Sequence, residues 1–337
     1  MKVRSAGRVM RSVVATAFLF GVACTAHTSA GTSVAATPTP RGVIVFDDDP
    51  LTGPTHRQLY IENADGSDVR PLVTSTADDV GASISPDGTQ VVFTRERDGR
   101  PDRMFVVNID GSDLHPLIPT GCPGTCGEAS EGHAWSSDGS RIVFTRELFD
   151  RGPVPFAVQV WIANADGSDA RQLTDPHHAQ DDDAGWSPDG SRIVFVHWAY
   201  GHPDRYRIEV IGTDGSGLRP ITPARLAAWA PAWSPDGTTI VFQAPPDPQG
   251  IGGTPQQLYA VAPDGSGLHE LTAGLGGYAS NAVAWSPDGA ELVFAHAPSG
   301  PLGSDLFVMR PDGSDAHALA ETPLNETDPD WGSAPAS

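Results

Sequence analysis

Short apolar runs recur along the chain about 50 residues apart, each after a Trp-Ser-Pro-Asp-Gly motif or a close variant. Five such units are present, with Ile84 replacing Trp in the first and Ser137 replacing Pro in the second. They cover 84–93, 135–144, 186–195, 233–242 and 285–294. The run Ile142-Val143-Phe144 is apolar at every position, as is typical of a strand covered on both faces. A period of this length indicates stacked supersecondary units, so the pattern predicts an all-β repeat protein.

A second motif, an apolar strand followed by Asp-Gly-Ser, occurs six times, at Asp65, Asp110, Asp166, Asp214, Asp264 and Asp312. The missing sixth copy of the first motif is divided between the chain ends. Trp331, within 328–332, stands where a first strand would begin, and 42–46 resembles a second strand without its partner. Joining them leaves no open edge. We therefore predict a six-bladed β-propeller of four-stranded antiparallel blades, closed by the C-terminal strand joining the N-terminal blade.

Within each blade we place strand A at Trp-Ser, strand B at the Ile-Val-Phe run, strand C at runs such as 258–261 and strand D at runs such as Leu271-Thr272. In the Ser-Pro-Asp-Gly turn, proline presets φ, and glycine accepts the positive φ that follows. In such a meander the A–B and C–D turns share one face of the disc. The longer B–C and D–A connections share the other, where a repeat protein usually binds.

The Trp-Ser-Pro-Asp-Gly and Asp-Gly-Ser repeats resemble the TolB-type propeller repeat, which is related to the tryptophan-aspartate repeat. The resemblance covers 42–332 and implies the propeller fold. Proteins with this propeller serve as periplasmic scaffolds, as lids of prolyl oligopeptidase-like enzymes or as lyases of acidic sugars. We expect no counterpart of the additional N-terminal α/β domain that TolB itself carries.

The N-terminal segment has the composition of an export signal. A basic stretch from Lys2 to Arg11 precedes an apolar run, 13–23, that is too short to span a bilayer. Residues 1–30 are predicted to be the signal peptide, with a lipobox-like cleavage and lipidation site at Cys24 or ordinary cleavage near Ala30. A flexible tether, 31–41, the propeller, 42–332, and a short tail, 333–337, complete the predicted organisation. The protein is therefore expected to be exported, as a cell-surface lipoprotein or in secreted form.

Two further cysteines, Cys122 and Cys126, form a close pair in a predicted loop, and we expect a disulfide between them in an oxidising compartment. The formal charge of −21 repels phosphate backbones and anionic headgroups. We therefore expect neither nucleic-acid binding nor polybasic membrane docking. Membrane contact is expected only through a lipid anchor at Cys24.

Acidic and histidine side chains are expected near the channel mouth on the long-loop face. The predicted ligand-binding residues are Asp79, Arg95, Glu131, His133, Arg146, Asp182, His197, His296 and Asp328. Among them, Arg95, Arg146, His197 and His296 follow strand B at equivalent positions, where a ring could hold an anionic group or make salt bridges. No cofactor is expected. The alternative is a divalent cation, calcium or manganese by preference, with His133, His177, His178 and Asp181 as candidate ligands.

No Gly-x-Ser-x-Gly, His-Glu-x-x-His or phosphate-loop motif occurs in the chain. The leading hypothesis is a non-catalytic cell-envelope or secreted binding propeller, monomeric, that binds an envelope or extracellular protein, or a glycan, through its long-loop face. The alternative is a metal-assisted, lyase-like carbohydrate-active enzyme using His133, His177 or His178. A purely structural spacer is the third class.

Overall fold

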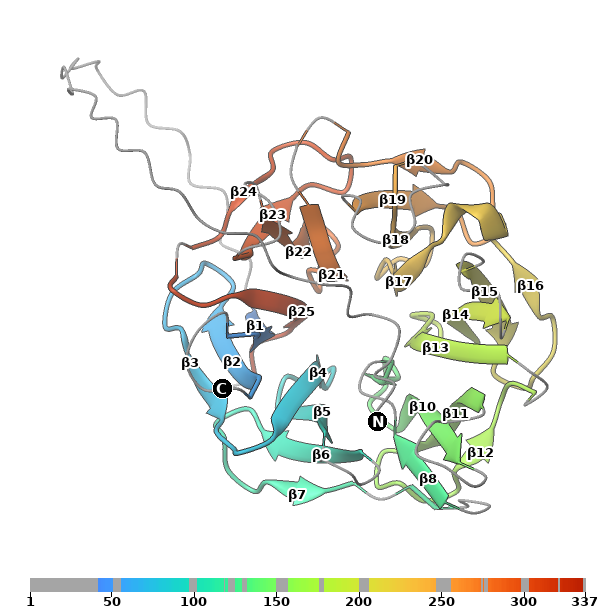
Figure 1. Ribbon diagram of the computed structural model, residues 1–337, viewed down its shortest axis with the longest axis horizontal. Coiled ribbons are helices and arrows are strands. Elements are labelled where there is room, and N and C mark those ends of the chain that lie inside the picture. Colours follow the sequence, from blue (N-terminus) through green and yellow to red (C-terminus); the bar gives the residue numbers. More distant parts are fainter. Residues whose placement is uncertain are drawn as a thin grey trace, which may run out of the picture.

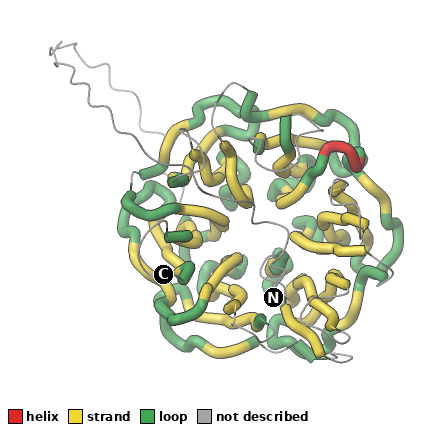
Figure 2. Tube along the Cα trace, viewed as in Figure 1, coloured by secondary structure: helices red, strands yellow, loops and turns green. Residues whose placement is uncertain are grey.

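The chain folds into β-sheets arranged around a common centre (Figures 1 and 2). The computed structural model describes residues 42–50, 56–96, 102–117, 119–120, 125–128, 132–149, 157–175, 179–199, 206–246, 256–273, 275, 278–297, 303–320 and 322–335. Apart from one short 3-10 turn, η1 (Ala224–Leu226), these residues form strands, turns and loops. No helix within them has the length and apolar character needed to cross a membrane. The predicted all-β class and propeller fold are confirmed.

Four separate sheets have four strands each. The first consists of β25 (Glu326–Gly332), β1 (Val43–Asp48), β2 (Gln58–Asn63) and β3 (Arg70–Val73). The second consists of β4 (Asp78–Ile84), β5 (Gln90–Glu96), β6 (Arg103–Asn108) and β7 (His115–Pro116). The third consists of β17 (Trp229–Trp233), β18 (Ile240–Ala244), β19 (Gln257–Val261) and β20 (His269–Glu270). The fourth consists of β21 (Tyr278–Trp285), β22 (Leu292–Ala297), β23 (Asp305–Met309) and β24 (His317–Ala318).

The remaining strands form one nine-stranded sheet. Strand pairing therefore does not give the six separate blades that the sequence predicts. Its strands are β8 (Thr125–Glu128), β9 (Ala134–Trp135), β10 (Arg141–Phe149), β11 (Ala157–Asn164), β12 (Arg171–Gln172), β13 (Ala179–Trp186), β14 (Arg192–Ala199), β15 (Tyr206–Gly212) and β16 (Arg219–Pro220). The sheet is continuous because β11 and β13 pair in parallel at one position, Val158 with Gln180. Five hydrogen-bonded sheets result, and no single ladder of strands runs around the whole molecule.

The first and last strands of the described chain pair with each other. Strand β25 lies antiparallel to β1, with Ile44 opposite Trp331 and Asp48 opposite Glu326. Strand β1 is thereby covered on both edges, by β25 and by β2. An apolar strand with an open edge would invite aggregation, and this pairing removes that edge.

Apolar side chains fill the spaces between neighbouring sheets. Each strand of the Ile-Val-Phe type contributes one phenylalanine with almost no exposed surface: Phe46, Phe93, Phe144, Phe195, Phe242 and Phe294. One apolar cluster joins the fourth sheet to the first, where Val293 and Leu306 pack with Ile44 and Trp331. Burying such side chains stabilises the fold by about 1.5–3 kcal/mol each. The core therefore lies between sheets, around the centre.

The Ser-Pro-Asp-Gly segments are the tight A–B turns that the sequence predicts. In the first turn, Gly88 donates its N–H to the Ser85 carbonyl at 2.8 Å and has φ +72°. The Asp87 carboxylate accepts hydrogen bonds from Ser85 Oγ at 2.6 Å and from the Thr89 N–H at 3.0 Å. The turn is thus satisfied by its own side chains.

Two predicted strand positions are corrected by the structure. Strand A ends at the tryptophan instead of starting there, because the following serine already belongs to the turn; β21, for example, ends at Trp285. Strand D comes two residues earlier than predicted, at His269–Glu270, where His269 pairs with Ala260. Strand C, β19, starts one residue before its predicted position and ends as predicted.

Candidate functional site

The innermost strands carry a repeated backbone irregularity. Three residues before each motif tryptophan, or its isoleucine equivalent, the main chain is left-handed, with φ between 49° and 90°. The six positions are Gly81, Gly132, Asp183, Ala230, Ala282 and Asp328. Strand pairing shifts register there in β4, β13, β17, β21 and β25. Such bulges redirect side chains and often occur beside binding sites. Figure 1 shows these strands surrounding the centre.

Four aspartates around these bulges form what we name the axial carboxyl cluster: Asp47, Asp182, Asp183 and Asp328. Asp47 Oδ2 accepts the Gly81 N–H at 3.2 Å. Asp183 Oδ2 accepts the Ala230 N–H at 3.2 Å, so each of these carboxylates ties its own sheet to the bulge of the next. Asp182 Oδ1 accepts Thr145 Oγ1 at 2.9 Å.

The surroundings of the cluster raise the pKa values of its carboxyl groups. Burial raises the pKa of Asp47 well above its ordinary value, and the negative charge of Asp328 raises it further. Burial also raises the pKa of Asp328 to about 6, with Arg57 opposing the shift and Asp183 adding to it. Burial likewise raises the pKa of Asp182 well above its ordinary value, and the negative charge of Asp183 raises it further. The four acids are thus linked in series, since the charge of Asp328 acts on Asp47 and that of Asp183 acts on both Asp328 and Asp182.

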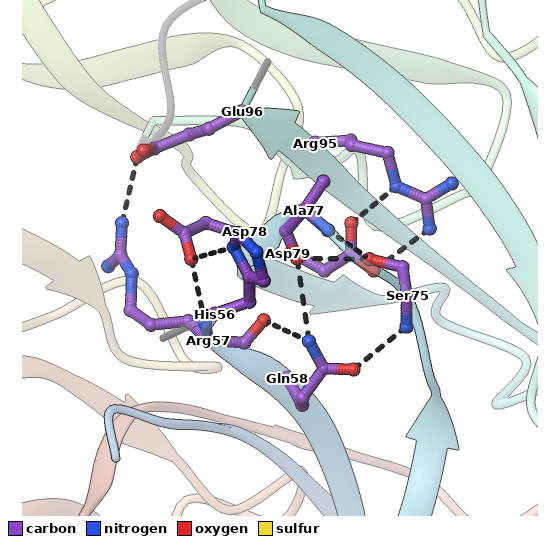
Figure 3. Close-up of polar contacts among 9 residues, drawn as sticks. All are labelled: His56, Arg57, Gln58, Ser75, Ala77, Asp78, Asp79, Arg95 and Glu96. Atoms are coloured by element: carbon purple, nitrogen blue, oxygen red, sulfur yellow. Dashed lines mark hydrogen bonds and ion pairs between the residues drawn. The ribbon is translucent and has the colours of Figure 1, made fainter. Parts of the chain in front are cut away.

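The positive charge of Arg57 opposes the raised pKa values of Asp47 and Asp328. Arg57 also belongs to the polar network in Figure 3. Its Nη2 donates to Glu96 Oε1 at 2.8 Å, and its main-chain N–H donates to Asp78 Oδ1 at 2.8 Å. His56 Nδ1 lies 3.5 Å from the same Asp78 oxygen. The network joins the loop before β2 to the outer ends of β4 and β5.

Four of the predicted site residues form two acid–base pairs, each at the end of a strand B. Arg95 donates to both carboxylate oxygens of Asp79, as Figure 3 shows: Nε lies 2.6 Å from Oδ1, and Nη2 lies 2.8 Å from Oδ2. His197 Nδ1 lies 2.7 Å from Asp181 Oδ1. The structure therefore places both pairs in ion-pair geometry, in which the acid of strand A holds the base of strand B.

The other predicted strand B residues lie deeper. Arg146 has no exposed surface, stacks over the ring of Trp161 at 4.5 Å and donates to the Pro119 carbonyl at 3.2 Å. His296 is buried against Phe307, with ring centroids 4.8 Å apart. Both residues contribute to packing between strands, and neither is open to solvent.

His133 is also buried, at 8% exposed. Burial lowers the pKa of its ring to about 4, although the nearby main chain of Val92 and Gly81 opposes the shift. Neither ring nitrogen reaches a hydrogen-bond partner of normal geometry within the described residues. His133 is therefore neutral at pH 7.

The predicted metal ligands do not converge where the structure describes them. Asp181 is occupied by His197, and the described part of the chain contains no group of three His, Cys, Asp or Glu side chains suited to a metal ion. Several predictions fall outside the described residues: those on Cys24, Cys122, Glu131, His177 and His178. Cys126 lies in β8, but its side chain is outside the description too.

Sequence reasoning missed an aromatic cluster beside Asp182 and Asp183. Trp198 and Tyr206 have ring centroids 5.3 Å apart, and Tyr206 and Trp229 are 5.6 Å apart. We name these three residues the aromatic cluster. Trp229 directly precedes the bulge residue Ala230, and the other two pair between β14 and β15. These aromatic residues lie outside the repeated motifs, so periodicity gave no signal for them.

The fold is that of a β-propeller protein, and the solved structures similar to it include TolB proteins. TolB from Acinetobacter baumannii is similar with a TM-score of 0.67 at 15% identity, over 88% of this chain and 68% of that one. A chain of a nidogen/laminin complex gives 0.61 at 14% identity, over 88% of this chain and all of that one. Oligogalacturonate lyase in complex with manganese gives 0.52 at 17%, over 80% and 72%. No protein-family model and no curated protein matches the sequence. Identities this low establish the fold alone.

Proposed function

We propose that the protein is a non-catalytic binding propeller that holds a protein partner on its long-loop face. The long-loop face is the side where strand B connects to strand C, and strand D to the next sheet. The opposite side, formed by the A–B and C–D turns, is the turn face. We further propose six structural repeats closed by the β25–β1 pair, because the nine-stranded sheet is joined by one residue pair and divides there into two units.

The observation that carries this proposal is a contrast between the two faces. On the turn face, motif aspartates are saturated by hydrogen bonds from neighbouring serines and main-chain N–H groups, which lower the pKa of Asp138 and Asp189 to about 2. Around the centre, aspartates such as Asp182 have raised pKa values instead. Aspartates whose hydrogen bonds are already made have little left to offer a partner. Buried acids with raised pKa values, in contrast, would be stabilised by a bound group.

The fold likeness to a chain of a nidogen/laminin complex supports protein binding as a use of this architecture. We also propose that the protein is exported and monomeric, with the signal peptide, the lipid anchor at Cys24, the tether and the Cys122–Cys126 disulfide as predicted from the sequence. The strong negative charge of the chain accords with a partner that is neither nucleic acid nor an anionic lipid surface.

Replacing long loops tests the proposal. In one variant, the connections 150–156 and 247–255 are each exchanged for a short Gly-Ser turn; in the control, the A–B turns at 85–88 and 234–237 receive Asn-Gly turns. Affinity-tagged protein is then used to capture partners from the envelope fraction. We expect partner recovery to fall at least tenfold in the first variant only. Equal recovery from both variants would contradict binding through the long-loop face.

The alternative function, a metal-assisted lyase acting on acidic glycans, is favoured by one finding, the fold likeness to oligogalacturonate lyase in complex with manganese. It would rely on His133, His177 or His178. His133 is buried and neutral, and a neutral ring can act as a ligand only where the ion can reach it. Release of unsaturated sugars from oligogalacturonate, abolished by chelator and restored by manganese, would establish this function in place of the binding role.

A further inference from the structure

We propose that Asp182 and Asp183, together with the aromatic cluster, bind a cationic lysine or arginine side chain presented by the partner protein. The inference rests on the proposed binding function and gives the partner a chemical character. It arises from a juxtaposition at one point of the long-loop side. Two half-buried acids of β13 lie near half-buried aromatic residues of β14, β15 and β17, because β13 pairs with β14 and Asp183 binds the main chain of β17.

The acids and the aromatic cluster are linked through the main chain next to Trp229. Asp183 Oδ2 accepts the main-chain N–H of Ala230, the residue after Trp229. Tyr206 is close enough to the acids that their charges, after burial, raise the pKa of its hydroxyl. The three rings pack on one apolar cluster between the nine-stranded sheet and the third sheet, and this fixes their positions. Carboxylates and aromatic rings thus border one site.

Within the described residues, the two acids have no ion-pair partner. Asp182 and Asp183 accept hydrogen bonds from Thr145, from the Asp183 N–H and from Ala230, and among the described residues no arginine or histidine forms an ion pair with them. Glu147 adds a further negative charge nearby. Both acids are half-buried, so an incoming group can reach them, yet enclosure by protein raises the pKa of each.

A second, independent observation concerns Asp47, in the first sheet. Asp47 has no exposed surface, and its Oδ1 atom has no hydrogen-bond partner in the described structure. The charge of Asp328 acts on Asp47, and that of Asp183 acts on Asp328, so the axial carboxyl cluster is one electrostatic unit. A buried carboxyl group without its full set of partners is costly, and a cation bound to the cluster would offset that cost.

An organic cation fits this site better than a metal ion. Calcium needs six to eight oxygen ligands, and the described residues contain no group of three candidate metal ligands. Aromatic faces, in contrast, attract ammonium and guanidinium groups within about 6 Å of the ring centroid. A lysine or arginine can lay its apolar stem on the rings while its charged head reaches the acids. The partner segment should therefore be basic at this point.

The test uses three acetylated, amidated peptides of one length, Gly-Ser-Xaa-Xaa-Gly-Ser, in which Xaa is arginine, lysine or citrulline. Citrulline keeps the shape of arginine without its charge. Binding is measured by tryptophan fluorescence and calorimetry at low and moderate salt. We expect the arginine peptide to bind, the lysine peptide to bind comparably or more weakly, and the citrulline peptide to bind at least tenfold more weakly.

Two variants make the result specific to the site. In D182N/D183N we expect at least a tenfold loss of affinity for the arginine peptide, and in W198L a smaller loss. The control, D113N/D169N, removes the same charge from the turn face, where Asp113 and Asp169 share the left-handed main chain of Asp183. Circular dichroism and the melting temperature check that all three variants fold. Affinity in the control should equal that of the parent protein.

Equal losses in D182N/D183N and D113N/D169N would overturn the proposal, because binding would then follow net charge alone. Binding of calcium or manganese by the same two acids, without binding of the arginine peptide, would also overturn it in favour of a metal site. If D182N/D183N captured the envelope partner undiminished while the loop-replaced protein did not, the cation site would be refuted and the proposed function would stand.

Discussion

Glu62 shows at the residue scale how this fold treats buried acids. It lies in β2, is 2% exposed, and its Oε2 atom has no hydrogen-bond partner in the described structure. Burial, with the charges of Glu326 and Asp65 adding to it, raises its pKa to about 8. The carboxyl group is therefore mostly protonated at pH 7 in the folded protein, whereas in the unfolded chain it is ionised.

We expect E62Q to stabilise the protein at pH 7, by about 1–3 kcal/mol, because the amide never has to take up a proton on folding. The gain should disappear near pH 4, where the acid is largely protonated in both states. Urea unfolding at the two pH values measures this. The comparison variant is E209Q. Glu209 is a buried acid that accepts a hydrogen bond from Arg207 at 2.6 Å, and because E209Q weakens this bond, stability should fall. A loss of stability in E62Q at pH 7 would show that the carboxyl group is ionised and paired.

At the element scale, the pairing of β25 with β1 depends on close approach to the second sheet. A Cβ atom on Gly332 would lie 2.4 Å from Ile84 Cγ2, well inside contact distance, although the φ of Gly332 is ordinary. Gly185, in β13, also has an ordinary φ, but there a Cβ atom would meet nothing closer than 3.6 Å. The two glycines therefore differ in the space around them.

We expect G332A to destabilise the protein by about 1–3 kcal/mol through overpacking, and G185A to change stability by less than about 0.5 kcal/mol. Thermal unfolding of the two variants provides the comparison. Equal stability of G332A and the parent protein would mean that β25 is not packed against β4 as described.

At the scale of the whole molecule, stability should depend on pH in an unusual direction. Glu62, Asp328 and Asp330 have folded-state pKa values of about 8, 6 and 6, each raised first by burial above the unfolded value near 4. Between those values the folded protein binds more protons than the unfolded chain, so stability decreases as pH rises. His133, with its pKa lowered to about 4, acts in the opposite direction below pH 6.5.

Because raised acids outnumber this one histidine, we expect the free energy of unfolding to be greatest near pH 4.5–5 and to fall as pH rises to about 8. Below about pH 4 the turn aspartates, whose pKa values are lowered by hydrogen bonds, lose their contribution. Urea titrations from pH 3.5 to 9 give the profile. A maximum at pH 7–8 would indicate that the central acids are ionised and neutralised in the folded state.

The sequence predicted what local chemistry determines. Ser-Pro-Asp-Gly forms its turn from its own side chains, so each copy was recognisable, and the spacing of copies predicted the propeller. The axial carboxyl cluster was not predicted as a unit because its members lie far apart in the sequence. Asp47 follows a strand B phenylalanine, Asp328 lies in a bulge near the C-terminus, and Asp183 lies in a bulge of the nine-stranded sheet. Only the arrangement around the centre brings these positions together. The aromatic cluster likewise depends on contacts between sheets.

The central claim is that a partner binds the long-loop face. Its most direct test is site-specific photo-crosslinking in living cells of the source organism. Benzoylphenylalanine replaces His56 or Arg103, which lie near the long loops. As controls it replaces Leu114, Leu218 or Leu268, which are exposed on the turn face. We predict that one partner is crosslinked from the first pair of positions and not from the leucines. Crosslinks from the leucines alone, or the same partner from every position, would contradict the account.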